Sequence, residues 1–280
     1  MHGLLATLPP LLQRRFVPLG RLGAGGMGEV LRVHDRLLDR AVALKLVPAG
    51  RSADGARLAA EFAVLSQLDH PGVVRVHEVG QAPGGAAWMS SELVTGQRLD
   101  HWLADTAPDA IAPLAADLLA TLAFLHGRGL VHGDIKPANV LVVTLDGRPW
   151  PVLIDFGLAS DLDDDGGLLG GTRAYLAPEL LRGAAPGPRS DLYALGRSLA
   201  PALARAPALA SLVAALSAAA PEDRPVDAEA ALAHLPGPPA HRLGARGGAA
   251  LWPDAALDAV AAALSAGPGH HAVALPADAD

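Results

Sequence analysis

The stretch that decides the fold is His132-Gly133-Asp134-Ile135-Lys136-Pro137-Ala138-Asn139, which is followed by Asp155-Phe156-Gly157. It holds the chain's only asparagine and one of its two lysines. Phosphoryl transfer to a hydroxyl needs these residue types, because Asp134 could accept a proton and Lys136 could neutralise the transferring group. Asn139 and Asp155 could hold a divalent metal through their oxygen atoms. The ordered set therefore predicts a phosphotransfer site.

The second lysine, Lys45, lies in the apolar stretch VALK on a predicted third strand. From such a strand an ammonium group could reach the α- and β-phosphates of a nucleotide. Glu61, in the middle of a predicted helix, is the natural counter-ion that would hold Lys45 in place. The alternative is that both are ordinary solvent-facing residues.

A glycine-rich segment, LGAGGMGEV, covers residues 22–30. A GxGxxG pattern also marks dinucleotide-binding folds, where it follows a strand and opens a helix. Here it lies between two predicted strands, which favours a hairpin whose backbone N–H groups fold over phosphates. A plain glycine-rich turn is the alternative. The candidate phosphate-binding positions are Gly23, Gly25, Gly26 and Gly28.

The hydrophobic pattern predicts a sheet-rich half followed by a helix-rich half, which is an α+β arrangement in two lobes. In the first half it predicts three strands within 16–47, a helix over 53–68 and strands within 70–80 and 86–94. The helix should bury Leu58, Phe62, Leu65 and Leu68. In the second half it predicts short strands at 140–143 and 152–156 and helices at 98–105, 113–127, 175–183, 189–204, 207–219 and 226–234.

Composition narrows the range of functions. The chain has 280 residues, a net charge of −7, a pI of about 5.8 and no cysteine. Without a basic stripe nucleic acid is not an expected partner, and without cysteines there is neither a disulfide framework nor a cysteine zinc site. The N-terminal stretch has no basic leader, and no later stretch reads as a membrane span. We expect a cytoplasmic protein with no membrane partner.

Together these motifs resemble bacterial serine/threonine protein kinases of the eukaryotic-like (Hanks) type, from about residue 16 to about residue 235. The resemblance implies a two-lobed fold, with a small antiparallel sheet and one helix in the N-lobe and a mainly helical C-lobe. The implied divisions are an N-terminal extension at 1–15, an N-lobe at 16–95, a C-lobe at 96–235, and a linker and C-terminal extension at 236–280.

The resemblance also implies ATP and Mg²⁺ in the cleft between the lobes, with a protein substrate that could include the chain itself. Lys136, Lys45, Glu61 and Thr172 then join Asp134 as catalytic residues, with Asn139 and Asp155 on the metal. The nucleotide contacts implied besides the glycines are Leu22, Val30, Ala43, Lys45 and Leu141, with Ser91 as gatekeeper and Glu92 and Val94 in the hinge. Further family positions are Leu65, His132 and Phe156 in a hydrophobic spine, and Ala177-Pro178-Glu179 with its buried partner Arg224.

Three departures from the family pattern stand out. Gly133 replaces the arginine that usually precedes the catalytic aspartate. The stretch between Gly196 and Arg224 is short, which puts the substrate platform in doubt. Residues 236–280 lie beyond the resemblance and could serve a further domain or partner. They read as a linker, a helix over 253–264, a strand at 271–275 and an acidic end at 276–280.

Two alternatives to a protein kinase remain open. A small-molecule phosphotransferase is one, because HGD also occurs in antibiotic and choline kinases. A kinase-fold interaction module without turnover is the other. We also expect that activity does not require phosphorylation between Asp155 and Glu179. The hydroxyl groups there belong to Ser160, Thr172 and Tyr175, and residues 161–167 already carry four aspartates.

Overall fold

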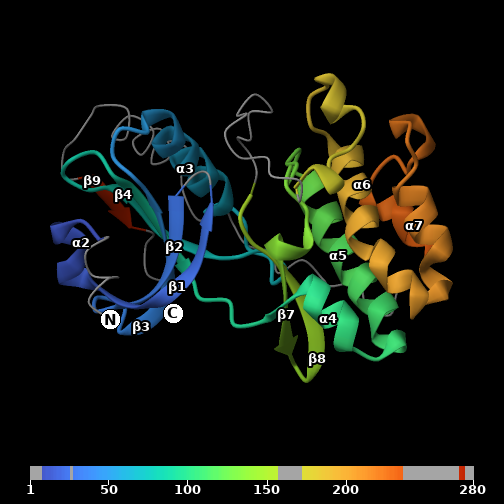
Figure 1. Cartoon of the computed structure of the whole chain (residues 1–280), viewed down its shortest axis with the longest axis horizontal. Helices are drawn as coiled ribbons and strands as arrows, with labels where there is room; N and C mark the ends of the chain where they lie inside the picture. The colour runs from blue at the N-terminus through green and yellow to red at the C-terminus, as the bar shows by residue number, and fades with distance from the viewer. Residues whose placement is uncertain (1–7, 26–27, 157–171, 236–270, 275–280) are drawn as a thin grey trace. The chain divides into compact units, whose positions relative to one another are not determined.

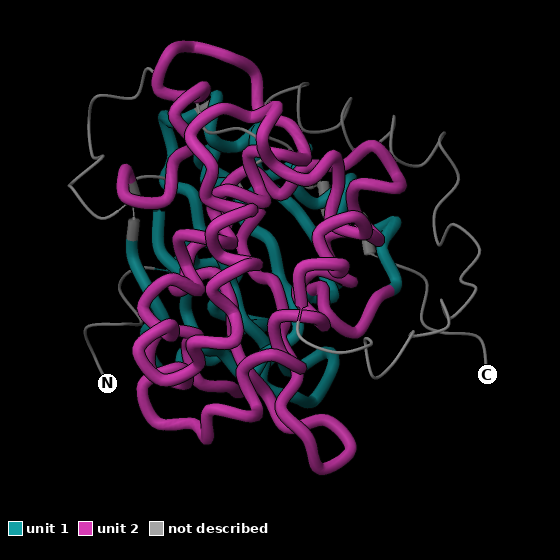
Figure 2. Tube along the Cα trace, turned by 90° about the vertical axis from the view of Figure 1, so that its right-hand side faces the viewer, with its two compact units in different colours: residues 1–69, 74–94, 247–280 teal, residues 70–73, 95–246 magenta. Residues whose placement is uncertain are grey.

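The structure is a computed structural model that describes residues 8–25, 28–156, 172–235 and 271–274. It divides into two compact units (Figure 2). Unit 1 comprises residues 1–69, 74–94 and 247–280, and unit 2 comprises residues 70–73 and 95–246. The division differs from the predicted lobe boundaries, because residues 70–73 belong to unit 2 and residues 247–280 belong to unit 1.

Unit 1 is built on an antiparallel sheet with the strand order β1-β2-β3-β5-β4-β9 (Figure 1). Its first five strands confirm the predicted pattern: β1 (Phe16–Gly25), β2 (Gly28–Asp35), β3 (Arg40–Val47), β4 (Val76–Gln81) and β5 (Ala87–Glu92). Side chains alternate between the two faces of a strand. On β3, Val42 and Leu44 are fully buried, whereas Ala43 and Lys45 are half-buried on the other face. The sheet therefore has one core face and one more accessible face.

Helix α3 (Ser52–Leu65) packs against β4 and β5. The apolar stripe predicted for it is buried, since Leu58, Phe62 and Leu65 are at most 2% exposed. Leu68, just beyond the helix, is also buried. The helix thus uses its apolar stripe to attach to the sheet, as expected for an amphipathic surface helix.

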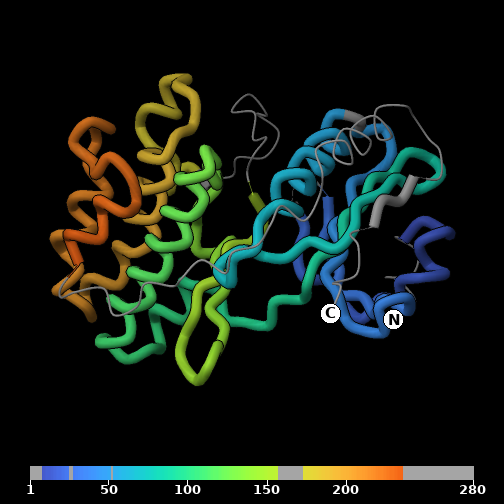
Figure 3. The backbone as a smooth tube through the Cα atoms, turned by 180° about the vertical axis from the view of Figure 1, so that it is seen from behind, coloured from blue at the N-terminus to red at the C-terminus, as the bar shows by residue number. Residues whose placement is uncertain are grey.

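Unit 1 also contains a short helix, α2 (Pro10–Arg15), which precedes the stretch from residue 16 that the family resemblance covers. The helix begins at a proline, whose missing N–H costs nothing in a first turn. Leu12 and the preceding Leu8 join Phe16 and Trp88 in one core cluster with the buried side of β2 and β3. Figure 3 shows the helix beside the sheet, in dark blue. Residues assigned to an N-terminal extension thus complete the core.

The predicted C-terminal strand is present as β9 (His271–Ala274). It pairs antiparallel with β4 and becomes the sixth strand of the sheet. The predicted linker, the helix over 253–264 and the acidic end lie outside the described residues.

Unit 2 is mainly helical, with a small sheet of β6 (Gln97–Arg98), β7 (Val140–Leu145) and β8 (Arg148–Leu153). Its helices are α4 (Leu99–Asp105), α5 (Ile111–His126), α6 (Pro188–Leu199), α7 (Ala210–Leu216) and α8 (Ala228–Ala231). Short 3-10 turns lengthen several of them. Their core side is mostly leucine, and it includes Leu118, Leu122, Leu192, Leu195 and Leu212.

Residues 108–126, which form α5 and the turn before it, are long and apolar enough to cross a membrane by length and composition alone. Half of that stretch is buried inside the protein. Leu114, Leu118 and Leu125 are at most 1% exposed. The helix is therefore accounted for as the central core helix of unit 2.

The helix predicted over 175–183 is not formed. The structure has one 3-10 turn in this stretch, at Leu180–Arg182, and another just before it, at Thr172–Ala174. Pro178 has no N–H to donate and disfavours a helical conformation at the residue before it. Gly183, with φ of 85°, ends the second turn in the left-handed region. The apolar spacing that suggested a helix therefore belongs to an irregular segment.

Candidate active site

In unit 1 the structure brings together the two charged residues that the sequence analysis paired. Lys45 Nζ donates a hydrogen bond to Glu61 Oε2 at 2.9 Å. The two side chains are 14% and 6% exposed, respectively. A pair shielded this well is screened less than a surface pair and holds the ammonium in one place. The pair lies between strand β3 and helix α3.

The residues predicted to contact a nucleotide share one face of the sheet. Val30 lies directly opposite Lys45, and Ala43 lies opposite Ser91. Because opposite residues in an antiparallel pair point to the same side, these four side chains gather on the more accessible face. The remaining predicted contacts in this unit lie on β1, at the end of β5 and just after it, at Leu22, Glu92 and Val94. Leu141 belongs to β7 of unit 2.

Gly28 is the position in the glycine-rich segment where a side chain cannot fit. Its φ is 135°, and a Cβ there would lie 1.9 Å from the carbonyl oxygen of Leu46. Gly25 pairs with Gly28 across the β1–β2 hairpin, and Gly23 lies further back on β1. Gly26 lies outside the described residues. The hairpin can therefore approach a ligand with its backbone.

In unit 2 the predicted base and its neighbours form one hydrogen-bonded group. Lys136 Nζ donates to Asp134 Oδ2 at 2.6 Å. Asn139 Nδ2 donates to the same Oδ2 at 2.8 Å and to the Asp134 carbonyl at 2.9 Å. The side chains of Asp134 and Lys136 are each 22% exposed. Asp134 is thus fixed in orientation while its carboxylate remains accessible.

The two predicted metal ligands are also neighbours. Asn139 Nδ2 lies 3.4 Å from the carbonyl oxygen of Asp155, and the Ile154 amide donates to the Asn139 carbonyl at 2.9 Å. With Nδ2 engaged in this way, the amide oxygen is the atom of Asn139 that could bind a metal. Asp155 is exposed and has φ of 57°, a backbone conformation uncommon outside glycine. One carboxylate and one amide oxygen fit Mg²⁺, which usually takes its other ligands from phosphates and water.

A buried carboxylate, that of Asp191, holds the backbone of this loop in place. Asp191, in the first turn of α6, accepts hydrogen bonds from the backbone amides of His132 at 2.8 Å and Gly133 at 2.9 Å. His126 Nε2, at the end of α5, lies 3.1 Å from the same carboxylate. Asp191 is 1% exposed. Its signal in the sequence is the stretch SDLYALG at 190–196, which resembles the start of the central helix of the C-lobe in the protein kinase family.

His132 links the loop to the Asp155 segment. Its ring packs on Phe156 with centroids 4.4 Å apart. Full burial lowers the pKa of His132 below its ordinary value, despite nearby carboxylates that act in the opposite direction. The imidazole is therefore neutral, and its Nδ1 accepts the Asp134 amide at 3.3 Å. Leu65, the other spine residue predicted, is buried in α3 of unit 1.

The segment before α6 is held by an ion pair. Arg224 donates to the two carboxylate oxygens of Glu179 at 2.6 and 2.9 Å, and the Arg224 side chain is fully buried. Burial alone would raise the pKa of Glu179, but the bonds from Arg224 outweigh it and lower that pKa. Such bidentate pairs fix geometry as well as charge. Thr172 begins the preceding 3-10 turn.

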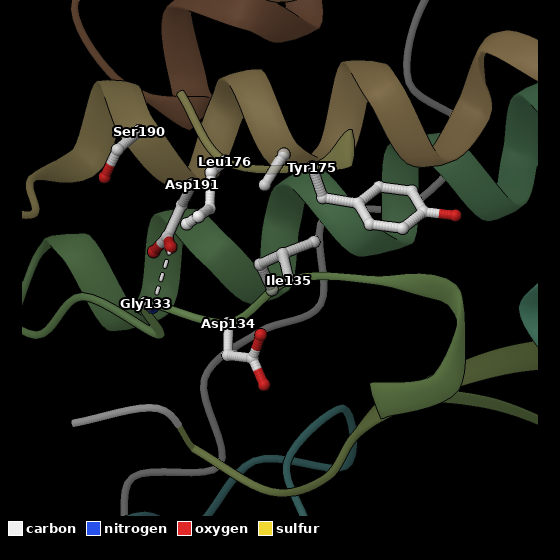
Figure 4. Close-up of a pocket in the computed structure, with 8 residues that line it drawn as sticks. Gly133, Asp134, Ile135, Tyr175, Leu176, Ser190 and Asp191 are labelled. Carbon is white, nitrogen blue, oxygen red and sulfur yellow. Dashed lines mark hydrogen bonds between the residues drawn. The ribbon is translucent and has the colours of Figure 1, made fainter. Parts of the chain in front are cut away.

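A small pocket lies beside Asp134, as Figure 4 shows. Gly133 contributes backbone alone to its wall, and the Asp134 carboxylate points away from Asp191. The lining residues are Gly133, Asp134, Ile135, Tyr175, Leu176, Ser190, Asp191 and Ala194. This lining contains two carboxylates and no cationic side chain.

Comparison with known proteins agrees with this geometry. Residues 16–219 match the family model described as the protein kinase domain. The chain is 36% identical over 190 residues to the serine/threonine-protein kinase pkn3 of Myxococcus xanthus. The matched residues cover 62% of this chain and 35% of that protein. It is 38% identical over 205 residues to the DNA damage-responsive serine/threonine-protein kinase RqkA of Deinococcus radiodurans, and the match covers 68% of this chain and 30% of that protein. It is 40% identical over 188 residues to the serine/threonine-protein kinase PknJ of Mycobacterium tuberculosis, and the match covers 64% of this chain and 32% of that protein. The chain thus spans about a third of the length of these relatives.

Proposed function

The chain belongs to the protein kinase domain family, and from this premise we propose that it transfers the γ-phosphoryl group of ATP to serine or threonine hydroxyls of proteins. The observation that carries the proposal is the group of Asp134, Lys136 and Asn139, in which Lys136 Nζ and Asn139 Nδ2 both donate hydrogen bonds to Asp134 Oδ2. Family membership implies ATP and a divalent metal. We propose that the metal is Mg²⁺ and that the domain works in the cytoplasm.

Each residue then has a role that its surroundings support. Asp134 accepts the hydroxyl proton of the acceptor and orients its oxygen for in-line attack. Lys136 stabilises negative charge on the transferring group, since a cation already placed costs no reorganisation during the reaction. Lys45, fixed by Glu61, binds the α- and β-phosphates.

The metal would be held by Asn139 and Asp155, and when bound it supplies neutralisation of charge on the phosphate oxygens. The backbone of the glycine-rich hairpin would cover the phosphates. Val30, Ala43 and Leu141 would enclose the adenine, with Ser91, Glu92 and Val94 beside it. These assignments follow the family pattern, residue by residue, onto positions that match it.

Protein substrates are favoured over small alcohols by two features. Lys136 occupies the position two residues after the base that serine/threonine kinases use, and its contact with Asp134 is present. The Glu179–Arg224 pair closes the segment that precedes α6, as in the protein kinase pattern. A small-molecule phosphotransferase remains the rival function, because the stretch between Gly196 and Arg224 is short.

The test is transfer of radiolabel from ATP by the purified chain and by its Asp134→Asn variant. The acceptors are the chain itself, generic protein substrates and a panel of small alcohols. We expect label in serine and threonine of protein, and a loss on the order of 10²–10⁴-fold in the variant, because a positioned base is removed. Matching circular dichroism spectra would show that both proteins are folded. Label in the alcohols alone would favour the rival, and turnover retained by Asp134→Asn would refute the assignment of the base.

We also propose that this activity does not require phosphorylation of the segment between Asp155 and Glu179. Gly133 presents no cation next to the base, and the pocket beside it has two carboxylates and no cation in its lining. A phosphate would find no charge partner in that pocket lining, although such partners are what order phosphorylated loops. The stretch 157–171, with its four aspartates, lies outside the described residues. Arg173, which is exposed, is the cation that a contrary mechanism would use.

To test this, the purified kinase is treated with phosphatase, and mass spectrometry confirms that the segment carries no phosphate. Initial rates before and after treatment should agree. Thr172→Ala should still lower the rate if its hydroxyl braces Asp134 and Lys136, as the family pattern implies. A large loss of rate on dephosphorylation that rephosphorylation restores would overturn the proposal.

A further inference from the structure

Residues 172–197, which include the 3-10 turns before α6 and most of that helix, are basic in a chain that is acidic as a whole. The chain carries a net charge of −7, yet this segment has four arginines and two acidic residues. Both acids already have partners, because Glu179 binds Arg224 and the buried Asp191 accepts backbone amides of the Asp134 loop. The arginines are Arg173, Arg182, Arg189 and Arg197.

None of these four arginines forms an ion pair with a residue that the structure describes. Three of them are exposed, and Arg189 is half-buried. Arg182 Nε donates to the Pro178 carbonyl at 3.2 Å. Arg197 Nε donates to the Ala174 carbonyl at 3.3 Å. Because a guanidinium has five N–H donors in a fixed fork, each of these single bonds leaves donors that can meet a carboxylate.

Backbone contacts bring three of the arginines to one region of unit 2. The bond from Arg197 to the Ala174 carbonyl places its guanidinium next to Arg173, which directly precedes Ala174. Arg189 and Arg197 both belong to α6, and residues eight positions apart differ by about 80° around a helix axis. The two side chains therefore leave the helix on neighbouring sides.

The fourth arginine is connected to the same region through Glu179. The Arg182 amide donates to the Glu179 carbonyl at 3.1 Å. Arg224 binds the Glu179 carboxylate and also donates to the Arg189 carbonyl at 2.9 Å. The turn that holds Arg182 thus lies against the start of α6. We call the surface formed by the four arginines the basic patch.

The position of Arg189 is not one that helix stability favours. It lies in the first turn of α6, where the helix dipole stabilises negative side chains and disfavours positive ones. The net charge of the chain favours weak attraction of cations and not of anions. Attraction of an anionic partner to this part of unit 2 would therefore come from the basic patch itself.

The basic patch adjoins the pocket beside Asp134 without belonging to its lining. Tyr175 and Ser190 contribute to that lining, as Figure 4 shows. Arg173 precedes Tyr175 by two residues, and Arg189 directly precedes Ser190. One residue of an extended peptide spans about 3.3–3.6 Å. The patch is therefore within a few peptide residues of a hydroxyl that Asp134 would accept.

We propose that the basic patch binds aspartate and glutamate side chains close to the acceptor residue, so that the preferred substrates are acidic serine/threonine segments of proteins. The inference rests on the proposed function, since the acceptor hydroxyl at Asp134 is what aligns the peptide. Arginine suits this partner because its planar fork matches the two oxygens of a carboxylate. The patch then selects among substrates, while the Asp134 group performs the transfer.

The proposal can first be tested by binding, without phosphoryl transfer. The probes are two fluorescent peptides with alanine in place of the acceptor, one flanked by aspartates and the other by asparagines. At low salt, fluorescence anisotropy should give the aspartate peptide a Kd about tenfold lower, and high salt should remove most of that difference. Equal Kd values at low salt would overturn the proposal. So would tighter binding of a single-stranded oligonucleotide of the same length, because the patch would then serve nucleic acid.

The patch is located by variants of matched charge. In Arg173→Gln/Arg197→Gln the two peptides should bind with similar Kd values. Arg98→Gln/Arg128→Gln removes the same charge at exposed positions elsewhere in unit 2 and should keep the difference. Arg182→Gln, in an exposed turn, is an independent variant that should narrow the difference by about threefold. Equal losses in the two double variants would show that net charge alone matters and would refute the patch.

The kinetic test uses the same peptides with serine restored at the acceptor position. The ratio of kcat/KM for the aspartate peptide to that for the asparagine peptide should be about ten, and it should fall toward one in Arg173→Gln/Arg197→Gln. Because each ratio is taken within one protein, a general loss of activity in the variant does not affect it. Selective binding without any transfer would contradict the proposed function and support the patch. Transfer with a ratio near one in the unmodified chain would contradict the patch alone.

Discussion

Lys45 and Glu61 illustrate how single residues act together in this protein. Each is shielded from solvent, and each is the other's partner at 2.9 Å. Removing one leaves the other as a buried charge whose orientation is no longer defined, which is more damaging than losing a surface pair. The function of the pair is therefore a property of neither residue alone.

Glu61→Ala should consequently lower the rate nearly as much as Lys45→Met, and the double variant should be little worse than either. Residues that act as a unit are strongly non-additive. Initial rates of the four proteins, with ATP affinity measured separately, give the coupling between the two. Glu29→Ala, which removes the partially exposed partner of a loose 3.7 Å pair with Arg21, is the control and should have little effect. Additive losses for Lys45 and Glu61 would show that they work independently.

Gly133 combines a backbone requirement with the absence of a charge. Its φ is 78°, a conformation that costs other residues about 1–2 kcal/mol. Gly133→Ala should therefore reduce the free energy of unfolding by about 1 kcal/mol and keep most of the rate. Gly133→Arg adds the same strain and a cation beside Asp134, so its unphosphorylated form should be much slower than the alanine variant. Rates of the two dephosphorylated variants make the comparison. Equal rates would mean that the backbone, and not the charge, matters here.

At the scale of elements, helix α2 is attached to the sheet by one side chain as well as by its leucines. Arg15 donates to both carboxylate oxygens of Asp35 at 2.9 and 2.8 Å and also binds Glu78. Asp35 is fully buried and Glu78 is 5% exposed. Burial alone would raise the pKa of Asp35, but the bonds from Arg15 and the Leu37 amide outweigh it and lower that pKa. The helix thus supplies the positive charge that two buried carboxylates need.

Arg15→Met keeps much of the side-chain volume but leaves both carboxylates unpaired. We expect a loss of about 3 kcal/mol in the free energy of unfolding, somewhat less than for a fully buried pair because Arg15 is 21% exposed. Urea denaturation followed by circular dichroism measures it. Arg14→Met, at an exposed position in the same helix, should change stability by about 0.5 kcal/mol or less. Similar effects of the two variants would show that α2 is held by its leucines alone.

For the molecule as a whole, two histidines, the partly buried His77 and the fully buried His132, predict how stability depends on pH. The pKa of His77 is lowered to about 4 and that of His132 is lowered as well, first by burial in each case. Between the ordinary value of 6.5 and these lowered values, the unfolded chain binds protons that the folded chain does not. Acidification through that window therefore favours unfolding, and stability rises again with pH.

We accordingly expect the melting temperature to fall as pH is lowered from 7 toward 4.5, before the carboxylates contribute. Asp35 and Glu179 have lowered pKa values and ordinary values of 3.8 and 4.5, so their stabilisation is lost mainly below this range. His77→Gln should flatten the curve, whereas His101→Gln, at an exposed position, should not. A melting temperature independent of pH over this range would contradict the lowered pKa values of these two histidines.

Several elements follow from local patterns alone. The alternation within residues 16–47 predicts three strands because side chains in a strand alternate between faces, and the spacing of Leu58, Phe62 and Leu65 predicts a buried helix stripe because a helix repeats every 3.6 residues. The short motifs around Lys45, Asp134 and Asp155 identify the catalytic residue types and their order. These features depend on neighbours close in the chain, so the amino-acid sequence by itself determined them.

Other features required the tertiary structure because their partners are far apart in the chain. Arg15 binds Glu78 across 63 residues, and Asp191 accepts the Gly133 amide across 58, pairings for which no local period exists. The stretch 175–183 has helical spacing, yet with Pro178 and the Glu179–Arg224 pair it forms only one 3-10 turn, at Leu180–Arg182. Whether a short apolar segment such as Leu8–Leu12 joins the core depends on the surface it meets, and that surface exists only once the sheet has formed.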